Sequence, residues 1–164
     1  MLAYPVSTKP IDYNEKVFMQ PKLDGVRCLI QYDKKTGVTA WSRTGKQWKN
    51  IDHITSSLEK WFKSNQTTVL DGELYNHDLR DDFETIISLV RRQTPDDIDM
   101  LESRDLVQFH CYDIIHPDNS PFEDRNRFIN YCVGQSSPHV HVVKTHNVAT
   151  ESLAKVIHQQ NLQW

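Results

Sequence analysis

The residues best suited to chemistry lie near the beginning of the chain, in the run Lys22-Leu23-Asp24-Gly25-Val26-Arg27. The amine of Lys22 is a potential nucleophile, and it must be deprotonated before it can attack an electrophilic phosphorus. The neighbouring Arg27 guanidinium and partial burial would both favour the uncharged, reactive amine. Gly25 could let the chain turn sharply, because glycine reaches backbone angles closed to other residues. The sequence therefore predicts a hairpin with an amine nucleophile beside a fixed cation.

The pattern Lys-x-Asp-Gly-x-Arg resembles the nucleophile motif of the covalent nucleotidyltransferases, which are ATP-dependent DNA ligases, RNA ligases and mRNA-capping enzymes. Three later segments resemble further motifs of this superfamily, in the expected order. They are Ser42-Arg43-Thr44-Gly45-Lys46, Leu70-Asp71-Gly72-Glu73-Leu74-Tyr75 and Val107-Gln108-Phe109-His110-Cys111-Tyr112-Asp113-Ile114. Their order matters more than any single match, since an Asp-Gly pair alone is common in ordinary turns.

The resemblance implies a mechanism in which Lys22 attacks the α-phosphate of ATP and becomes AMP-lysine. The adenylate would then pass to the 5′-phosphate of nicked duplex DNA, and the 3′-hydroxyl at the nick would displace AMP. Arg43 would contact phosphate, for which a guanidinium offers a fork of fixed donors. Glu73 would serve the ribose or a divalent metal, and Mg²⁺ would offset charge as pyrophosphate leaves.

The resemblance also implies a site for the purine and ribose. Gln20 and Pro21, directly before the nucleophile, occupy the place where the family reads the adenine edge. Arg27, Glu73 and Tyr112 would hold ribose and purine, with Tyr112 stacked on the base. A tyrosine on an apolar strand is also a common core residue, so both interpretations of Tyr112 stay open.

These matches indicate an ATP-dependent DNA ligase of the compact phage type, acting in DNA replication, repair or recombination, because only a short leader precedes Lys22. An RNA ligase or a capping-type nucleotidyltransferase is one alternative, and a non-catalytic nucleotide- or DNA-binding remnant is another. The absence of two motifs of the family favours the non-catalytic remnant. The family's fourth motif, a Glu-Gly pair, and its fifth, a pair of lysines, should follow the segment 142–164, and neither is present.

The length of 164 residues suits one hydrophobic core and leaves no room for the two domains of a minimal ligase. We therefore expect one domain, residues 1–164, that forms the N-terminal part of an adenylation domain and lacks the OB domain. A C-terminal segment or a second polypeptide would be needed to complete it.

The charge is unevenly distributed, although the net charge of −3 argues weakly against a free-standing nucleic-acid binder. Residues 1–70 hold eleven Lys and Arg against six Asp and Glu, while residues 71–164 hold eight against sixteen. The basic part contains the nucleophile. Lys46, Trp48 and Lys49 in this part could contact a DNA backbone.

The cysteines Cys28, Cys111 and Cys132 occur without framework spacing, which predicts reduced core residues of an intracellular protein. The sequence has no signal peptide, lipidation motif or apolar run of membrane length. This predicts a soluble protein of the cytoplasm, or of the host cytoplasm if a phage encodes it. Of the eight histidines, His139 and His141 alternate along one short β-type stretch and the other six lie in unrelated segments without paired cysteines, a pattern that does not favour zinc.

Short β-type runs alternate with amphipathic helices, which predicts an α+β fold. The expected strands are 17–20, 27–32, 38–43, 68–74, 106–115 and 139–143. The expected helices are 52–64, 83–90, one capped by Thr94, 121–132, and one capped by Thr150. The family resemblance implies the ligase-type nucleotidyltransferase fold, in which helices flank two antiparallel sheets and the nucleotide binds in the groove between the sheets.

Overall fold

The computed structural model describes residues 5–133 and 137–161, and these residues divide into two compact units. The smaller unit contains the residues up to Lys22 and those from Lys144 onwards, and the larger unit is Leu23–Val143. The boundary between the units directly follows the proposed nucleophile. No helix in the described ranges is long and apolar enough to cross a membrane.

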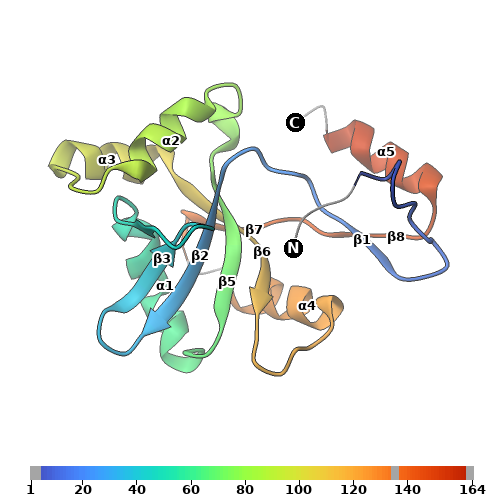
Figure 1. Cartoon of the computed structure of the whole chain (residues 1–164), viewed down its shortest axis with the longest axis horizontal. Helices are drawn as coiled ribbons and strands as arrows, with labels where there is room; N and C mark the ends of the chain where they lie inside the picture. Colours follow the sequence, from blue (N-terminus) through green and yellow to red (C-terminus); the bar gives the residue numbers. More distant parts are fainter. Residues whose placement is uncertain (1–4, 134–136, 162–164) are drawn as a thin grey trace. The chain divides into compact units, whose positions relative to one another are not determined.

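The larger unit is built on a six-stranded mixed sheet, shown in Figure 1. In spatial order its strands are β4 (Gln47–Trp48), β3 (Gly37–Trp41), β2 (Val26–Asp33), β5 (Val69–Tyr75), β6 (Gln108–Ile115) and β7 (Val140–Val142). Neighbouring strands are antiparallel except for β6 and β7, which are parallel. The expectation of wholly antiparallel sheets therefore fails at this edge, because the long connection through the next helix returns the chain in the same direction.

Side-chain alternation gives the central strands one apolar face and one polar face. Cys28 and Ile30 on β2 and Leu70 on β5 are fully buried on the apolar face. Arg27 on β2 and Glu73 on β5 are directly paired across the two strands and project from the opposite face. The side chains that could do chemistry therefore lie on the face turned away from the hydrophobic core.

Helices cover the apolar face and the ends of this sheet (Figure 1). They are α1 (Asp52–Ser64), α2 (Phe83–Arg91), α3 (Asp97–Leu106) and α4 (Phe122–Cys132), with a short 3₁₀ helix at His77–Leu79. The predicted helix 52–64 is confirmed with the same bounds, and it buries Ile54, Leu58 and Phe62. Trp61 is half-buried and packs edge-on against Phe62 at the border of the core.

The start of α3 differs from the prediction of a cap at Thr94. The Asp96 carboxylate accepts a hydrogen bond from the Asp99 amide (2.8 Å), and the Asp99 carboxylate accepts one from the Asp96 amide (3.2 Å). This reciprocal capping box satisfies two amide donors at once. The helix therefore begins after Asp96, and Pro95 lies outside it.

The smaller unit consists of a two-stranded antiparallel sheet and one helix. The elements are β1 (Val17–Met19), β8 (His146–Val148) and α5 (Glu151–Asn161). The predicted cap of the last helix is confirmed, since the Thr150 hydroxyl accepts a hydrogen bond from the Leu153 amide at 3.2 Å. The strand β8 was not predicted from the sequence.

Gly25 does not form the predicted hairpin. Lys22 follows β1, which pairs with β8, whereas β2 pairs with β3 and β5. Gly25 has no positive φ, but a Cβ built on it would lie 2.4 Å from the Leu74 carbonyl oxygen and 2.6 Å from Cγ of Glu73. Glycine is required here for close backbone approach to β5, and not for its range of backbone angles.

Gly72 is equally confined, and this leads to a stability prediction. A Cβ at Gly72 would lie 2.5 Å from both the His110 carbonyl oxygen and the Phe109 ring. We expect Gly72→Ala to lower the free energy of unfolding by about 1–3 kcal/mol, the usual cost of overpacking. Urea denaturation would measure it. If the ring is the obstacle, Gly72→Ala should cost less in a Phe109→Leu background, and unchanged stability in the single variant would contradict the prediction.

The predicted burial of the cysteines is confirmed for two of them. Cys28 and Cys111 are fully buried free thiols. The Cys132 side chain lies outside the described residues.

Candidate active site

An ion pair anchors the polar face of the larger sheet. Arg27 Nε donates to Asp71 Oδ1 at 3.0 Å, and Arg27 Nη2 donates to Asp71 Oδ2 at 2.6 Å. Asp71 is 8% exposed, and its hydrogen bonds and charge raise the pKa of Arg27 further above its ordinary value. The two-point contact fixes the plane of the guanidinium. Sequence reasoning assigned no role to Asp71, although it lies two residues before Glu73 and must share its face.

Tyr112 lies beside this ion pair, at an irregularity in the pairing of β5 and β6. Asp71 pairs with Asp113 and Gly72 pairs with Cys111, so Tyr112 is the extra residue of a β-bulge. Its ring is half-buried. Burial raises the pKa of the Tyr112 phenol, and the carboxylates of Asp71 and Glu73 and a hydrogen bond to Asp71 raise it further. These neighbours place the ring on the polar face and outside the hydrophobic core.

Substitutions of Tyr112 can show whether its ring stacks on a purine or packs in the hydrophobic core. Stacking on a purine needs the ring and not the hydroxyl, so Tyr112→Phe should keep most of the affinity for an ATP analogue. Tyr112→Ala should lose roughly 0.5–1.5 kcal/mol of aromatic contact in addition to buried area. Phe109→Ala is the matched control, because this ring is fully buried on the same strand. It should cost about 3–5 kcal/mol of stability.

Nucleotide titration and urea denaturation of all three variants would decide between stacking and core packing. A large loss of stability with intact nucleotide affinity in Tyr112→Ala would show that the ring serves packing alone.

Glu73 lies on the same polar face as the Arg27 and Asp71 pair. It is half-buried and pairs with Arg27 on one side and with His110 on the other. Asp71 is already engaged by Arg27, and the described residues contain no group of three or more His, Cys, Asp or Glu able to hold a metal. Mg²⁺ commonly binds through one or two carboxylates together with substrate phosphates. The residues therefore fit a Mg²⁺ held jointly by Glu73 and a nucleotide, and they do not form a closed protein cage.

Next to Glu73 lies a cluster of rings that the sequence analysis missed. His110 stacks on His141 with 4.8 Å between ring centroids, and the Tyr75 ring meets His110 edge-on at 5.2 Å. His110 Nε2 donates to Gln108 Oε1 at 3.0 Å. Burial, and then the charges of His141 and His77, lower the pKa of His110 to about 4. Alternation along the predicted strands could have placed Tyr75 and His110 on the Glu73 face, but their pairing needs the register.

The lowered pKa of His110 predicts acid sensitivity. The unfolded chain binds a proton near the ordinary pKa of 6.5, while the folded chain binds it only near 4. Stability should therefore be complete above pH 6.5 and fall on acidification to pH 4, by a total on the order of 3 kcal/mol. Burial also lowers the pKa of His53 and of His141, which adds to the same trend. Urea denaturation at several pH values would measure it, and His110→Phe should flatten the profile. An unchanged profile in this variant would contradict the assignment.

Arg43 lies on an ordered loop between β3 and β4. The Ser42 amide donates to the Lys46 carbonyl at 2.8 Å, and the Lys46 amide donates to the Ser42 hydroxyl at 2.9 Å. Gly45 closes the turn with a φ of 79°. The strand predicted to run to Arg43 ends at Trp41, and Arg43 is exposed at the tip of the loop. Among the described residues, Arg43 forms no hydrogen bond or ion pair with Arg27 or Asp71.

The residues suggested for DNA contact differ in their exposure to solvent. Lys46 and Lys49 are exposed, as such a contact requires. Trp48 is only 7% exposed and belongs to the hydrophobic core, so its proposed role at a DNA backbone was wrong.

The remaining candidates belong to the smaller unit. Gln20 Nε2 donates to the Thr145 hydroxyl at 2.9 Å, and Pro21 is half-buried. Lys22 is exposed, so the partial burial expected around the amine is not found. The structure thus brings Arg27, Glu73 and Tyr112 together on one sheet face, while the nucleophile belongs to the other unit.

Solved structures similar to this chain include DNA ligases and an archaeal RNA ligase, and they share its fold. A structure titled Pmar-Lig_Pre. has a TM-score of 0.69 and 23% identity, over 98% of this chain and 38% of that one. A structure from a study of Lig E DNA ligases that bind DNA with a minimal scaffold has a TM-score of 0.69 and 19% identity, over 99% and 57%. The ATP-dependent DNA ligase of bacteriophage T7 in complex with ATP has a TM-score of 0.64 and 16% identity, over 89% and 53%.

The chain thus spans between 38% and 57% of the length of these three proteins. Comparison with curated protein sequences gives no match. The α+β, ligase-type nucleotidyltransferase fold expected from the motifs is confirmed by the structural matches. A family model described as the ATP dependent DNA ligase domain matches residues 1–163. The chain therefore belongs to the ATP-dependent DNA ligase domain family.

Proposed function

We propose that these residues form the N-terminal part of the adenylation domain of an ATP-dependent DNA ligase. The enzyme would seal nicks in duplex DNA through an AMP-lysine intermediate, in replication, repair or recombination. The observation that carries the proposal is the grouping of Arg27, Asp71, Glu73 and Tyr112 on one polar sheet face. An aromatic ring, a fixed guanidinium and a carboxylate are the groups that a base, a ribose and a metal-bound phosphate need.

The covalent step would take place at Lys22. Its uncharged Nζ attacks the α-phosphorus of ATP, and a bond forms between nitrogen and phosphorus. The bond from the α-phosphorus to the bridging oxygen breaks, pyrophosphate leaves, and the amine gives a proton to solvent. The 5′-phosphate of the nick would then take the adenylate from Lys22, and the 3′-hydroxyl would displace AMP to form the phosphodiester.

The other side chains would bind and position the substrate. Tyr112 would stack on the purine, Arg27 and Glu73 would hold the ribose, and Gln20 and Pro21 would contact the adenine edge. The chemistry that a Mg²⁺ ion at Glu73 supplies is neutralisation of charge on the leaving pyrophosphate.

Arg43 would contact phosphate from its exposed loop. The ordered turn at Ser42 and Gly45 would hold the loop in place for this contact.

The test is covalent labelling of this chain with α-labelled ATP or GTP, with Mg²⁺ present. We expect label only from ATP, and at low stoichiometry, because the glutamate and the lysine pair of the family's later motifs are not among these residues. Preferential labelling by GTP would favour the capping-type alternative. Binding of an ATP analogue by calorimetry without any covalent label would favour a nucleotide-binding module.

The polynucleotide is tested separately with the labelled protein. Transfer of AMP to the 5′-phosphate of nicked DNA supports the DNA ligase, and preferential transfer to nicked RNA would favour the RNA ligase.

A further inference from the structure

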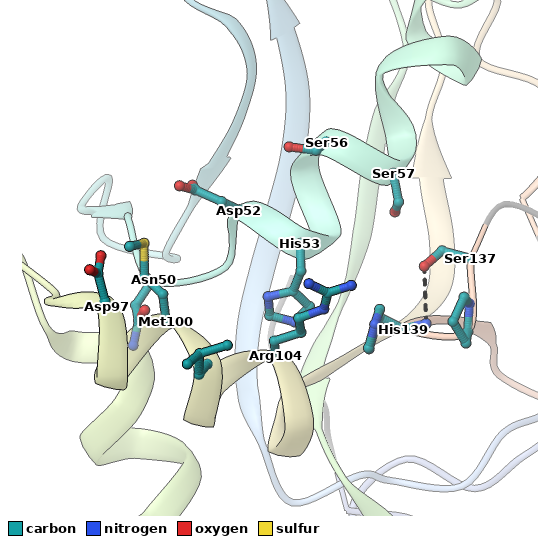
Figure 2. Close-up of a pocket in the computed structure, with 12 residues that line it drawn as sticks. Asn50, Asp52, His53, Ser56, Ser57, Asp97, Met100, Arg104, Ser137 and His139 are labelled. Carbon is teal, nitrogen blue, oxygen red and sulfur yellow. Dashed lines mark hydrogen bonds between the residues drawn. The ribbon is translucent and has the colours of Figure 1, made fainter.

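A cavity in the larger unit lies away from the proposed nucleotide site. It has a volume of about 740 Å³ and lies between the start of α1, α3 and the segment before β7, as Figure 2 shows. This volume is within the range of small-molecule sites. The helix α1 packs on the apolar face of the sheet, with Cys28 and Ile30, whereas Tyr112 lies on the polar face. The cavity is therefore on the opposite side of the sheet from the ring proposed to stack on the purine.

Three nitrogen-bearing side chains converge in this cavity. Figure 2 shows the Arg104 guanidinium beside the His53 imidazole, with His139 next to them. The rings of His53 and His139 meet edge-on with 4.9 Å between centroids. Within residues 5–133 and 137–161, Arg104 makes no ion pair. A guanidinium that projects into a cavity without a carboxylate partner is suited to an anionic ligand.

The positive charge of this cavity is on Arg104 and not on His53. His53 Nε2 lies 3.0 Å from the Val107 carbonyl oxygen, so this nitrogen carries the hydrogen. Burial, and then the charges of His139 and Arg104, lower the pKa of His53, so the ring is neutral near pH 7. Arg104 is therefore the cationic group that an anion would contact, with the neutral His53 ring beside it.

The rest of the cavity is partly apolar. Met100 and Leu101 line it from α3, and Leu101 is 61% exposed. The carboxylates of Asp52 and Asp97 also line the cavity, but in Figure 2 they lie on the side away from the Arg104 guanidinium. The cavity thus has one end with cationic and imidazole groups, an apolar wall, and a separate acidic end.

We propose that this cavity binds a small organic phosphate monoester. Its phosphate group contacts the Arg104 guanidinium beside the rings of His53 and His139, and its apolar body packs against Met100 and Leu101. A phosphate monoester has a pKa near 6, so near pH 7 it is mostly a dianion whose oxygens accept hydrogen bonds from a guanidinium. A sulfate ester or an ionised carboxylate carries only one negative charge and should bind Arg104 more weakly. The ligand class therefore follows from a guanidinium without an ion-pair partner among the described residues, in a cavity that also has an apolar wall.

The proposal is tested with phenyl phosphate, a monoester with a compact apolar body. Its binding is measured by calorimetry, and the NMR signals of the His53 and His139 rings locate the site. We expect saturable binding that shifts both rings, with phenyl sulfate binding more weakly. Arg104→Ala should weaken phenyl phosphate at least about tenfold, the effect of losing a charged hydrogen bond. Arg91→Ala, which removes an exposed arginine from the end of α2, should leave binding unchanged.

A second variant tests the apolar wall. Leu101→Ala should weaken phenyl phosphate while leaving inorganic phosphate unaffected, because only the ester has a body to contact the wall. Equal binding of phenyl phosphate to wild type and Arg104→Ala would overturn the proposal. So would shifts confined to residues outside the cavity, or no binding at millimolar concentrations.

Two sources of the phosphate can be distinguished. Displacement of phenyl phosphate is compared for a 5′-phosphorylated oligonucleotide and for the nucleoside monophosphate that equals its first nucleotide. Stronger displacement by the oligonucleotide would identify a nucleic-acid end as the ligand. Stronger displacement by the monophosphate would identify a small metabolite. The proposal does not depend on the proposed ligase activity. Lys22→Ala should bind phenyl phosphate like wild type, and Arg104→Ala should form AMP-lysine like wild type.

Discussion

Replacing Lys22 with alanine is expected to reduce covalent labelling by α-labelled ATP to background. The adenylate is proposed to form a bond to the Lys22 amine, and no neighbouring side chain in the connection to β2 supplies another amine. Lys22→Arg should be equally inactive, because a guanidinium stays protonated and cannot act as a nucleophile. Mass spectrometry of the labelled peptide would measure the effect. This pair of variants separates loss of the nucleophile from loss of positive charge.

The matched control is Lys9→Ala, which removes another exposed lysine from the smaller unit. It should label like wild type. An ATP analogue should still bind to Lys22→Ala, since Arg27, Glu73 and Tyr112 are unchanged. Label that persists in Lys22→Ala would place the nucleophile elsewhere and would contradict the proposed mechanism.

Asp71→Ala is expected to have the largest effect on stability among the site variants, about 3–5 kcal/mol, the usual cost of removing one partner of a buried ion pair. The change leaves the Arg27 guanidinium without its two-point contact and removes the hydrogen-bond partner of Tyr112. The loss should lie toward the lower end, because the Arg27 side chain is 36% exposed and keeps some contact with water. Urea denaturation followed by tryptophan fluorescence would measure it.

The same variant should weaken binding of an ATP analogue, because Asp71 positions two of the proposed nucleotide contacts. Asp71→Asn should fall between wild type and alanine, since the amide keeps an acceptor but loses the charge. Asp105→Ala is the control, as it removes an exposed carboxylate from the larger unit. A double-mutant cycle with Arg27→Ala should show a coupling energy above about 0.5 kcal/mol. Additive effects would show that the ion pair does not hold the site together.

Helix bounds were predicted well where a helix buries a regular stripe of apolar residues. Ile54, Leu58 and Phe62 recur at helical spacing, and the helix that they define has the predicted bounds. The start of α3 was predicted two residues too early, because Thr94 and Asp96 are both acceptable caps. Each has an aspartate three positions later, so the sequence does not choose between them, and in the structure the reciprocal bonds form between Asp96 and Asp99.

The chemistry of the candidate site was partly predictable, and its geometry was not. The types and order of Arg27, Glu73 and Tyr112 were enough to identify them as candidates. Their grouping on one face depends on the register of three strands and on a β-bulge, neither of which local sequence determines. The role of Asp71 was not predicted for the same reason, since its contact with Arg27 joins two different strands. The reason for Gly25 was missed because close approach to β5 is a property of the packed sheet.

The burial of Cys28 and Cys111 makes their alkylation a measure of local opening in the large sheet. Both thiols are fully buried, and desolvation raises the pKa of each above its ordinary value, so almost no reactive thiolate is present in the folded sheet. The two residues belong to β2 and β6, on either side of Gly72 in β5. An alkylating reagent can therefore reach them only when the central strands separate or the covering helices move off the apolar face. The rate of alkylation, resolved peptide by peptide, would then follow the opening equilibrium of the strands that carry Arg27 and Tyr112. A nucleotide that binds across those strands should slow the modification of both thiols together.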